Sequence, residues 1–411
     1  PGIMPNLDAL AADGVVFEHA WSPMATTHPS HSTMMTGLYP RYHGVRWNGD
    51  KLPEDITTVA QWLQGAGYQT GAFVAYKAML FRAGLKRGFD AVSDHEKPRG
   101  EPAIRPGGDV VQLAANWLKT VDPQQPVFLW VHLFEAHGPY ELTDYARARL
   151  GAYDGPLAQG HRDDEEGSLR NRDILASAAE LGALRILYEG EAHESDRRVG
   201  ELMELLNQNG LLQDAVVVAT GDHGQSLGEN DFIGHGPRLD ESIMRVPLLM
   251  KDFRGSEFEF AEIRVAAPVG LVDIAPTLAD LAGNPVPEGL QGRSLAKALD
   301  GEEPAPGIYF GEVTLKTGRG EKRVEHANEN EVAVYLWPYK LTRDEQGDRV
   351  WELEDLELTE KLVEDPGRFH EVRDRLTPHM EAFLANRWDK SSAAELDEDD
   401  LEELRSLGYL Q

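Results

Sequence analysis

A threonine hydroxyl directly before two closely spaced histidines is the first candidate for chemistry in this sequence. Thr27 opens the run Thr-His-Pro-Ser-His that ends at His31. Pro29 suits the first turn of a helix, because that turn needs no backbone N–H from it, and residues 30–35 can continue the turn. The unpaired N–H groups and positive dipole of such a helix would face the Thr27 hydroxyl and an ester bound beside it. Taken alone, an ordinary helix cap explains the run equally well.

A second candidate group directly follows the apolar run 215–220 and consists of Asp222, His223 and Gly224. An Asp and a His at the carboxyl end of a parallel strand can converge on one divalent cation, because the chain leaves the pleat there and its side chains no longer alternate. The competing interpretation is a structural turn, in which Asp222 caps the backbone and Gly224 adopts a positive φ.

Two further histidines occupy comparable positions. His137 follows the apolar run 127–134, and His235 lies twelve residues after His223. An imidazole at either position can donate to a developing oxyanion or protonate a leaving oxygen. A single histidine is more often structural, but three at strand ends favour a site. His193, among the acidic residues of a helix, is interpreted as structural.

These groups need a scaffold that brings strand ends together. The pattern alternates apolar strands with amphipathic helices, which predicts an α/β fold with a largely parallel sheet whose strand ends carry the site. Segments 94–108 and 143–173 are predicted loops over the active edge. Helices are predicted at 6–12, 55–64, 110–119, 175–208 and 368–386, and strands at 15–17, 71–75, 127–134 and 215–220.

The character of the sequence changes near residue 308. Residues 332–341 and 350–356 alternate in the manner of strands around a polar turn, which predicts a small antiparallel sheet. We therefore expect a catalytic domain over residues 1–307 and a C-terminal subdomain over 308–411, with a helix and an acidic tail.

Composition limits the classes of function. The chain has 411 residues, 70 of them acidic and 40 basic, for a net charge of −30. Such a surface repels phosphate backbones, so no nucleic-acid partner is expected. No run approaches the roughly 20 apolar residues that span a bilayer, so no integral membrane segment is expected either. The absence of cysteine excludes disulfides and leaves the compartment open.

Several motifs together resemble the sulfatase family of the alkaline phosphatase superfamily. In that family a Cys or Ser, any residue, Pro, Ser and Arg precede a helix ending in Thr-Gly-x-Tyr-Pro, and residues 27–40 are similar to this pattern. Residues 222–224 resemble the family's metal motif, and His137 and His235 resemble its active-site histidines. The resemblance implies an alkaline phosphatase-like fold: a mixed, mostly parallel sheet between helices, with a small C-terminal antiparallel subdomain.

The sequence departs from that family at two positions. Thr27 stands where sulfatases convert a Cys or Ser to formylglycine, and His31 stands where they have an arginine. Threonine is instead the nucleophile of the family's phosphoester-cleaving relatives. The resemblance therefore implies a metal-dependent hydrolase of small anionic esters that forms a phosphothreonine at Thr27, with a phosphate monoester, diester or phosphonate as substrate. The alternatives are a sulfatase without formylglycine, a phospho-group transferase, and a non-catalytic binding protein.

The resemblance also assigns roles. Thr27, Asp222 and His223 are expected to bind a divalent metal, Zn or Mn being favoured over Ca or Mg. One metal is favoured over two, because the segment 134–140 lacks the Asp and His spacing of two-metal relatives and offers only Glu135 beside His137. The expected catalytic residues are Thr27, His137 and His235, and the expected substrate contacts are His31 and Lys77, with Arg46 and Asn48 as further candidates.

One expected element is not found in the sequence. Members of the family begin with a buried strand that carries metal-binding Asp residues, roughly twenty residues before a segment like Pro5–Ala11. We expect that strand, and at least one further metal ligand, to lie upstream of Pro1. The oligomeric state and the presence of a signal peptide are left open.

Overall fold

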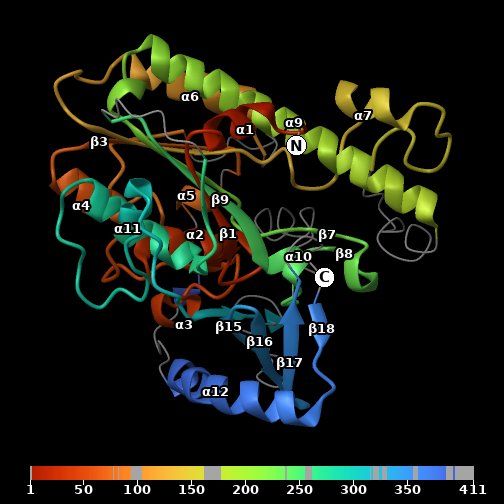
Figure 1. Ribbon diagram of the computed structural model, residues 1–411. Coiled ribbons are helices and arrows are strands. Elements are labelled where there is room, and N and C mark those ends of the chain that lie inside the picture. Colours follow the sequence, from red (N-terminus) through yellow and green to blue (C-terminus); the bar gives the residue numbers. More distant parts are fainter. Residues whose placement is uncertain are drawn as a thin grey trace.

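Figure 1 shows the computed structural model of the chain, with helices on both sides of the strands and a separate sheet at the C-terminal end. The described residues are 2–76, 78–81, 83–93, 104–161, 177–236, 238–254, 262–314, 316–317, 324–325, 331–354, 360–385 and 392–393.

The first part of the main sheet is mixed. Strand β1 (Val15–Trp21) pairs in parallel with β10 (Ile263–Val265) and antiparallel with β9 (Arg245–Asp252), and β9 pairs antiparallel with β6 (Val216–Thr220). The short β11 (Val269–Gly270) extends the parallel pairing of β1. The sheet thus brings the end of β1, which leads to Thr27, to the same edge as the carboxyl end of β6.

The second part is parallel throughout. Strand β3 (Gln69–Val74) lies between β4 (Ala91–Val92) and β5 (Val127–His132). Within the described part of the chain, β5 and β6 each pair on one side only. All residues of both strands are half-buried, although most of them are apolar. A strand lying between β5 and β6 would find an edge to pair with on either side, and the expected upstream strand stays a prediction.

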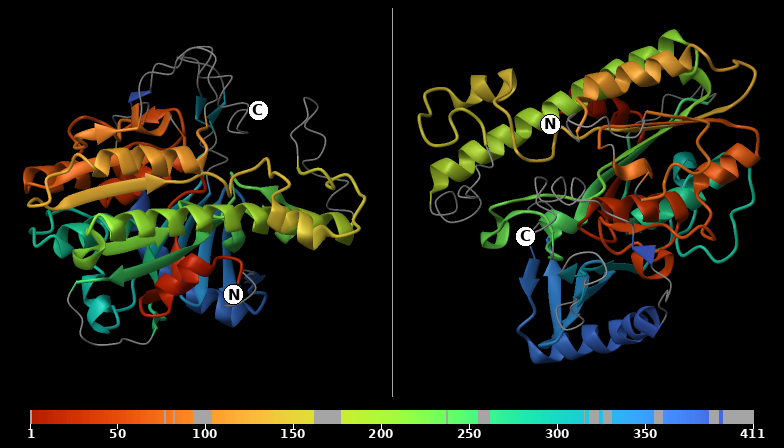
Figure 2. Two further views of the ribbon diagram at one scale, coloured as in Figure 1. Left: turned by 90° about the horizontal axis from the view of Figure 1, so that it is seen from above. Right: turned by 180° about the vertical axis from the view of Figure 1, so that it is seen from behind.

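Helices cover both faces of these strands. Helices α1 (Pro5–Ala11), α6 (Gly107–Leu118) and α9 (Ala178–Gln208) lie on one face, and α2 (Thr27–Thr36), α4 (Val59–Gly65) and α11 (Ile274–Leu281) lie on the other (Figures 1 and 2). The α/β architecture expected from the alternating pattern is confirmed. Helix α4 begins four residues later than expected, because Thr58 and Gln61 form a capping box that fixes its start.

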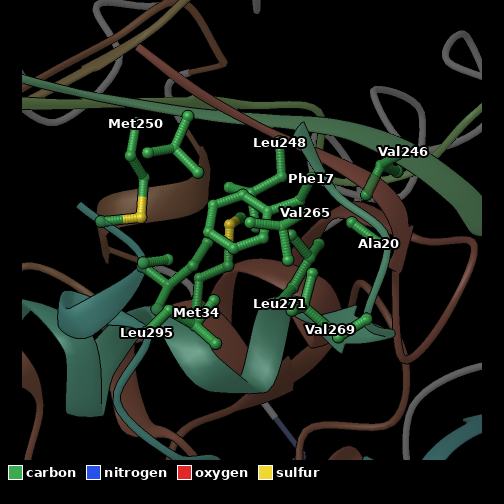
Figure 3. Close-up of a cluster of buried hydrophobic side chains, with 14 residues drawn as sticks. Phe17, Ala20, Met34, Val246, Leu248, Met250, Val265, Val269, Leu271 and Leu295 are labelled. Atoms are coloured by element: carbon green, nitrogen blue, oxygen red, sulfur yellow. The ribbon is translucent and has the colours of Figure 1, made fainter. Parts of the chain in front are cut away.

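The core beneath the site is apolar and continuous. Figure 3 shows Phe17, Leu248 and Val265 from three neighbouring strands packed against Met34 of α2. Burial of these side chains stabilises the fold by roughly 1.5–3 kcal/mol each. Because Met34 lies in this cluster, the core also fixes the depth and rotation of α2, the helix that begins with Thr27.

A separate antiparallel sheet lies at the C-terminal end, as expected. Its order is β12-β15-β16-β17-β18, and its strands are β12 (Tyr309–Glu312), β15 (Val332–Leu336), β16 (Tyr339–Asp344), β17 (Gly347–Leu353) and β18 (Glu360–Leu362). Helix α12 (Pro366–Ala385) packs along one face of it (Figure 1). The domain boundary between residues 307 and 308 stays a prediction.

The structure describes part of the two predicted loops and the contacts of the acidic residue Asp196 in α9. The interval 143–173 contains a helix, α7 (Asp144–Leu150), where only loop was expected, because Thr143 caps its first turn. Residues 94–103 and 162–173 lie outside the described residues. In α9, Asp196 accepts the backbone N–H groups of Asn6 and Leu7 and so caps α1. None of the described helices is long and apolar enough to cross a membrane.

Candidate active site

Helix α2 is polar in sequence and buried along its whole length. All ten of its residues are buried, and Thr27 is the first of them, after the extended N-cap residue Thr26. Pro29 is the third residue of the helix and lies in its first turn, as expected. Buried polar side chains are costly unless they find partners, so this helix is held by specific hydrogen bonds as well as by packing. Its first-turn N–H groups and positive dipole end lie at Thr27.

Two of these bonds fix α2 to other segments. The Ser30 hydroxyl donates to the carbonyl oxygen of Asp222 at 2.6 Å, and the Asn48 side-chain oxygen accepts the N–H of His28 at 2.9 Å. The first bond fixes the helix to the loop after β6, and the second satisfies one of the free N–H groups of its first turn. Thr27 therefore begins a helical turn in which His28 and Ser30 are both hydrogen-bonded to other segments.

His31 and His223 both approach the Asp222 carboxylate. His31 Nδ1 and His223 Nε2 each lie 3.5 Å from Asp222 Oδ2. His31 Nδ1 also lies 2.9 Å from the carbonyl oxygen of Thr27, which accepts its proton. His132, the last residue of β5, places its ring 5.1 Å from that of His31. The carboxyl ends of β5 and β6 therefore meet at α2, as the fold class predicts for a site.

The turn interpretation of residues 222–224 fails in one respect. Gly224 is not among the residues with positive φ. The reason for glycine is space: a Cβ at Gly224 would lie 2.3 Å from the carbonyl oxygen of Ser242. The close approach lets the Gly224 N–H donate to Ile243 at 2.6 Å, which fixes the loop against α10 (Glu241–Met244).

His137 and His235 form a pair. Their Nε2 atoms lie 3.2 Å apart, and His235 Nδ1 lies 3.3 Å from the carbonyl oxygen of Ala25, two residues before Thr27. His137 Nδ1 lies 2.6 Å from the carbonyl oxygen of Gly138 and must donate to it, which leaves Nε2 of a neutral His137 as an acceptor. Nδ1 of each ring therefore faces a carbonyl oxygen, and the contact between the two Nε2 atoms is a hydrogen bond only when the pair binds one additional proton. The His235 ring lies 4.4 Å from that of His223, which joins this pair to Asp222.

The burial and charges of the site keep the Asp222 carboxyl ionised and three of the surrounding imidazoles neutral. Burial raises the pKa of Asp222, but His223, His31, His132 and His235 outweigh this effect and hold that pKa well below its ordinary value. Burial lowers the pKa of His31, and it lowers the pKa of His132 to about 3 with a contribution from His31. The pKa of His235 is also lowered, by burial and then by His223. At neutral pH these three imidazoles are neutral.

The sequence offered only weak grounds for one residue of the site, Asn48, and a second residue, His132, was not predicted. Asn48 is 1% exposed, and its side-chain nitrogen is buried without a hydrogen-bond partner among the described residues. This leaves two donors beside the first turn of α2. His132 was not predicted at all, because it lies inside a nearly continuous apolar strand. Its signal was available: it is the last residue of β5, the position where a parallel sheet places its functional side chains.

Other predicted residues lie elsewhere. Glu135 accepts the N–H groups of Gly107 and Phe134, so it caps α6 and is not turned toward His137. Arg46 pairs with the buried carboxylate of Glu312 in β12. Lys77 lies outside the described residues.

The donor types suit a divalent cation, but the described set is incomplete. Asp222 supplies an ionised carboxylate and His223 an imidazole, the ligands that Zn and Mn accept. Among the residues that the structure describes, no three side chains of His, Asp or Glu are placed to hold one metal ion. The metal-ligand roles of Asp222 and His223, and the expected upstream ligand, stay predictions.

Comparisons with known proteins agree with this geometry. The phosphonate monoester hydrolase of Agrobacterium radiobacter superposes with a TM-score of 0.70 at 21% identity, covering 96% of this chain and 94% of that one. The ulvan-active sulfatase of Formosa agariphila is 26% identical over 331 residues, 73% of this chain and 61% of its own. Arylsulfatase K of Bos taurus is 27% identical over 332 residues, 71% of this chain and 60% of its own.

The mixed sheet between helices is therefore a fold that this chain shares with the phosphonate monoester hydrolase. The sulfatase family model matches residues 1–284. The chain belongs to the sulfatase family. It spans about three fifths of the length of the two sulfatases to which it is similar.

Proposed function

We propose that the chain hydrolyses small anionic esters, phosphoesters in particular, with Thr27 as the nucleophile. The observation that carries this proposal is the position of Thr27: it is the first residue of a buried helix, in a segment whose Ser30 bonds to Asp222 and whose Ala25 bonds to His235. A hydroxyl at this point meets the positive end of a helix, so an ester oxyanion beside it is stabilised.

The proposed reaction includes one divalent metal. We assign Asp222 and His223, together with Thr27 at the start of α2, as the metal ligands that the described part of the chain contributes. A divalent cation bound there supplies positive charge that favours both the Thr27 alkoxide and the anionic substrate. The type of metal follows from the donors, which favour Zn or Mn, and the proposal keeps one metal rather than two.

The reaction then has two displacements. The Thr27 oxygen attacks phosphorus in line, the bond to the leaving oxygen breaks, and a phosphothreonine forms. We assign protonation of the leaving oxygen to the His137–His235 pair: one proton bound between its Nε2 atoms makes an imidazolium, which can pass that proton to the leaving oxygen. Water then attacks phosphorus, the bond from the Thr27 oxygen to phosphorus breaks and phosphate, or the phosphonate or phosphate monoester, is released; the histidine pair recovers its proton from this water.

Asn48 extends the proposal to the oxyanion. Its side-chain oxygen accepts the His28 N–H, and its NH₂ group has no hydrogen-bond partner among the residues that the structure describes. We assign these donors to a non-bridging oxygen of the bound ester, where they would stabilise developing charge. His31 lies where the family's arginine would supply a permanent cation. Its Nδ1–H is donated to the Thr27 carbonyl, so we propose that it contacts the anion through Nε2 when that atom is protonated.

The test is the covalent intermediate. The protein is exposed briefly to 4-nitrophenyl phosphate, a 4-nitrophenyl phosphodiester and a phenylphosphonate monoester in the presence of Zn or Mn, then quenched in acid and analysed by mass spectrometry. The expected result is a phosphate- or phosphonate-bearing adduct on Thr27, absent in Thr27→Ala. Full activity in Thr27→Ala without an adduct would refute the mechanism.

The rival function is sulfate ester hydrolysis on the same site. The two sulfatases named above support it, because sulfate and phosphate esters are similar in shape. Thr27 and His31 speak against it, since neither residue matches formylglycine chemistry. Parallel assays with 4-nitrophenyl sulfate separate the two: turnover of the sulfate with no turnover of any phosphorus ester would replace our proposal with this one.

A further inference from the structure

A lysine of the C-terminal sheet is buried against the segment that carries His235. Lys340 in β16 is only 1% exposed. Its ammonium donates to the carbonyl oxygen of Leu239 at 2.8 Å and forms an ion pair with Glu360 of β18. The rings of Tyr335 and Trp351 lie 5.9 and 5.6 Å from it. Lysine is almost never buried this fully unless its charge is paired, so its contacts are specific.

The same cluster reaches the segment that leads to Thr27. Glu241, the first residue of α10, is 1% exposed and lies in the electrostatic field of Lys340 and Glu360. The Trp21 indole N–H donates to both of its carboxylate oxygens, at 3.3 and 3.2 Å. Trp21 is the last residue of β1 and precedes Thr27 by six positions. One buried cluster therefore contacts the segment that leads to Thr27 and the segment that follows His235.

Backbone bonds carry these contacts toward the site. The Ser22 N–H donates to Met244 at the end of α10 at 2.8 Å, so β1 and α10 are joined immediately beyond the Trp21 and Glu241 side chains. His235 lies four residues before Leu239 and reaches back to the carbonyl oxygen of Ala25. A displacement of Leu239 or Glu241 is thus transmitted over a few residues to the His235 imidazole.

We infer that Lys340 and Glu241 are positioning residues, through which the C-terminal sheet sets the place of the His235 imidazole relative to Thr27. The catalytic part of this inference rests on the proposed function. Its physical basis is that a buried ion cluster contributes little net stability compared with apolar side chains, whereas fixing the register of two elements is the best attested use of such clusters.

The test compares two buried lysines. Lys340→Met removes the ammonium, while Lys251→Met removes one that pairs with Asp13 at the opposite end of β9, away from the site. Lys340→Met is expected to lower kcat by about 10- to 100-fold with KM within about twofold, because small misplacements of catalytic groups have effects of this size. Lys251→Met is expected to keep kcat within about twofold. An equal loss of kcat in both variants would overturn the inference.

A double-mutant cycle separates positioning from general loss of structure. If Lys340 acts through His235, then Lys340→Met has almost no further effect on kcat in a His235→Ala background. Multiplicative effects of the two substitutions would show that Lys340 acts elsewhere. Should Lys340→Met fail to fold, Lys340→Met with Glu360→Gln removes both charges of the ion pair and carries the same test.

Hydrogen exchange gives a readout that does not depend on activity. In Lys340→Met the amides of peptides containing His235 and Leu239 are expected to exchange at least about tenfold faster than in the unsubstituted chain, with those of β6 unchanged. Unchanged exchange at His235 and Leu239 would overturn the inference. Faster exchange in a protein that turns over none of the esters would refute the proposed function and leave the positioning role supported.

Discussion

The Ser30 hydroxyl donates to the carbonyl oxygen of Asp222 across 192 positions of sequence, at 2.6 Å. This bond fixes α2, which begins with the proposed nucleophile Thr27, to the loop of the proposed metal ligands. Ser30→Ala leaves the Asp222 carbonyl without that donor, which is expected to reduce the free energy of unfolding by about 1–3 kcal/mol and kcat by about tenfold. The control is Ser32→Ala on the same helix, whose hydroxyl has no hydrogen-bond partner among the described residues. Denaturant melts and initial rates check both, and equal effects of the two substitutions would contradict the role of Ser30.

One substitution at Asn48 separates the role of its side-chain oxygen from the role of its NH₂ group. Asn48→Asp keeps the oxygen that accepts the His28 N–H and removes the NH₂ donors. We expect kcat/KM to fall by about 100-fold, the size of effect seen when an oxyanion donor is removed, while the helix content measured by circular dichroism is unchanged. Asn48→Ala is expected to lose stability as well as activity. Near-normal kcat/KM in Asn48→Asp would mean that the amide nitrogen does not contact the substrate.

Gly224→Ala tests the close approach of the Asp222 loop to α10. The new Cβ would lie 2.3 Å from the Ser242 carbonyl oxygen, so the loop must move and the bond from the Gly224 N–H to Ile243 is lost. We expect metal affinity and kcat to fall by tenfold or more. Gly221→Ala is the matched control, because a Cβ there meets its nearest atom at 3.5 Å. Zinc titration by calorimetry measures both variants, and similar affinities in the two would argue against this packing role.

Metal binding is testable without a substrate. Because a cation bound to the folded state stabilises it, Zn or Mn at about 100 times its Kd is expected to raise the unfolding free energy by about 2.7 kcal/mol, and chelation should reverse the shift. Asp222→Asn is expected to abolish the shift, since it removes the carboxylate ligand. Thermal melts with and without metal give the result. A shift of equal size in Asp222→Asn, or binding of two equivalents per chain, would contradict the single-site proposal.

Glu241 predicts a pH dependence of stability. Burial raises its pKa from the ordinary 4.5 to about 7; Lys340 lowers it and Glu360 raises it, and Trp21 and then Arg245 lower it further. A carboxyl with a raised pKa stabilises the fold below pH 4.5, and this contribution is lost as the pH rises through 7. Glu241→Gln should therefore match the parent chain near pH 4.5 and exceed its unfolding free energy by on the order of 3 kcal/mol at pH 8. Denaturant melts across this range would contradict the prediction if the difference stayed constant.

Local patterns predicted much of the scaffold. Apolar runs such as 127–134 and 215–220 became β5 and β6, and the end of each run was expected to carry functional residues. The start of α4 was placed too early, because a capping box at Thr58 decides it. The helix α7 was missed because the segment 143–173 is polar and its short helix depends on packing against α9.

By itself the sequence determined the family, several of the main strands and helices and the proposed roles of Thr27, Asp222 and His235, because motifs at the ends of elements are local and survive in the chain as spacing. Only the tertiary structure decided which distant groups fix these residues. Ser30 reaches Asp222 across 192 positions, and Lys340 reaches Leu239 across 101. Contacts of that range depend on how sheets and helices pack, and packing leaves no periodic signal in a single sequence.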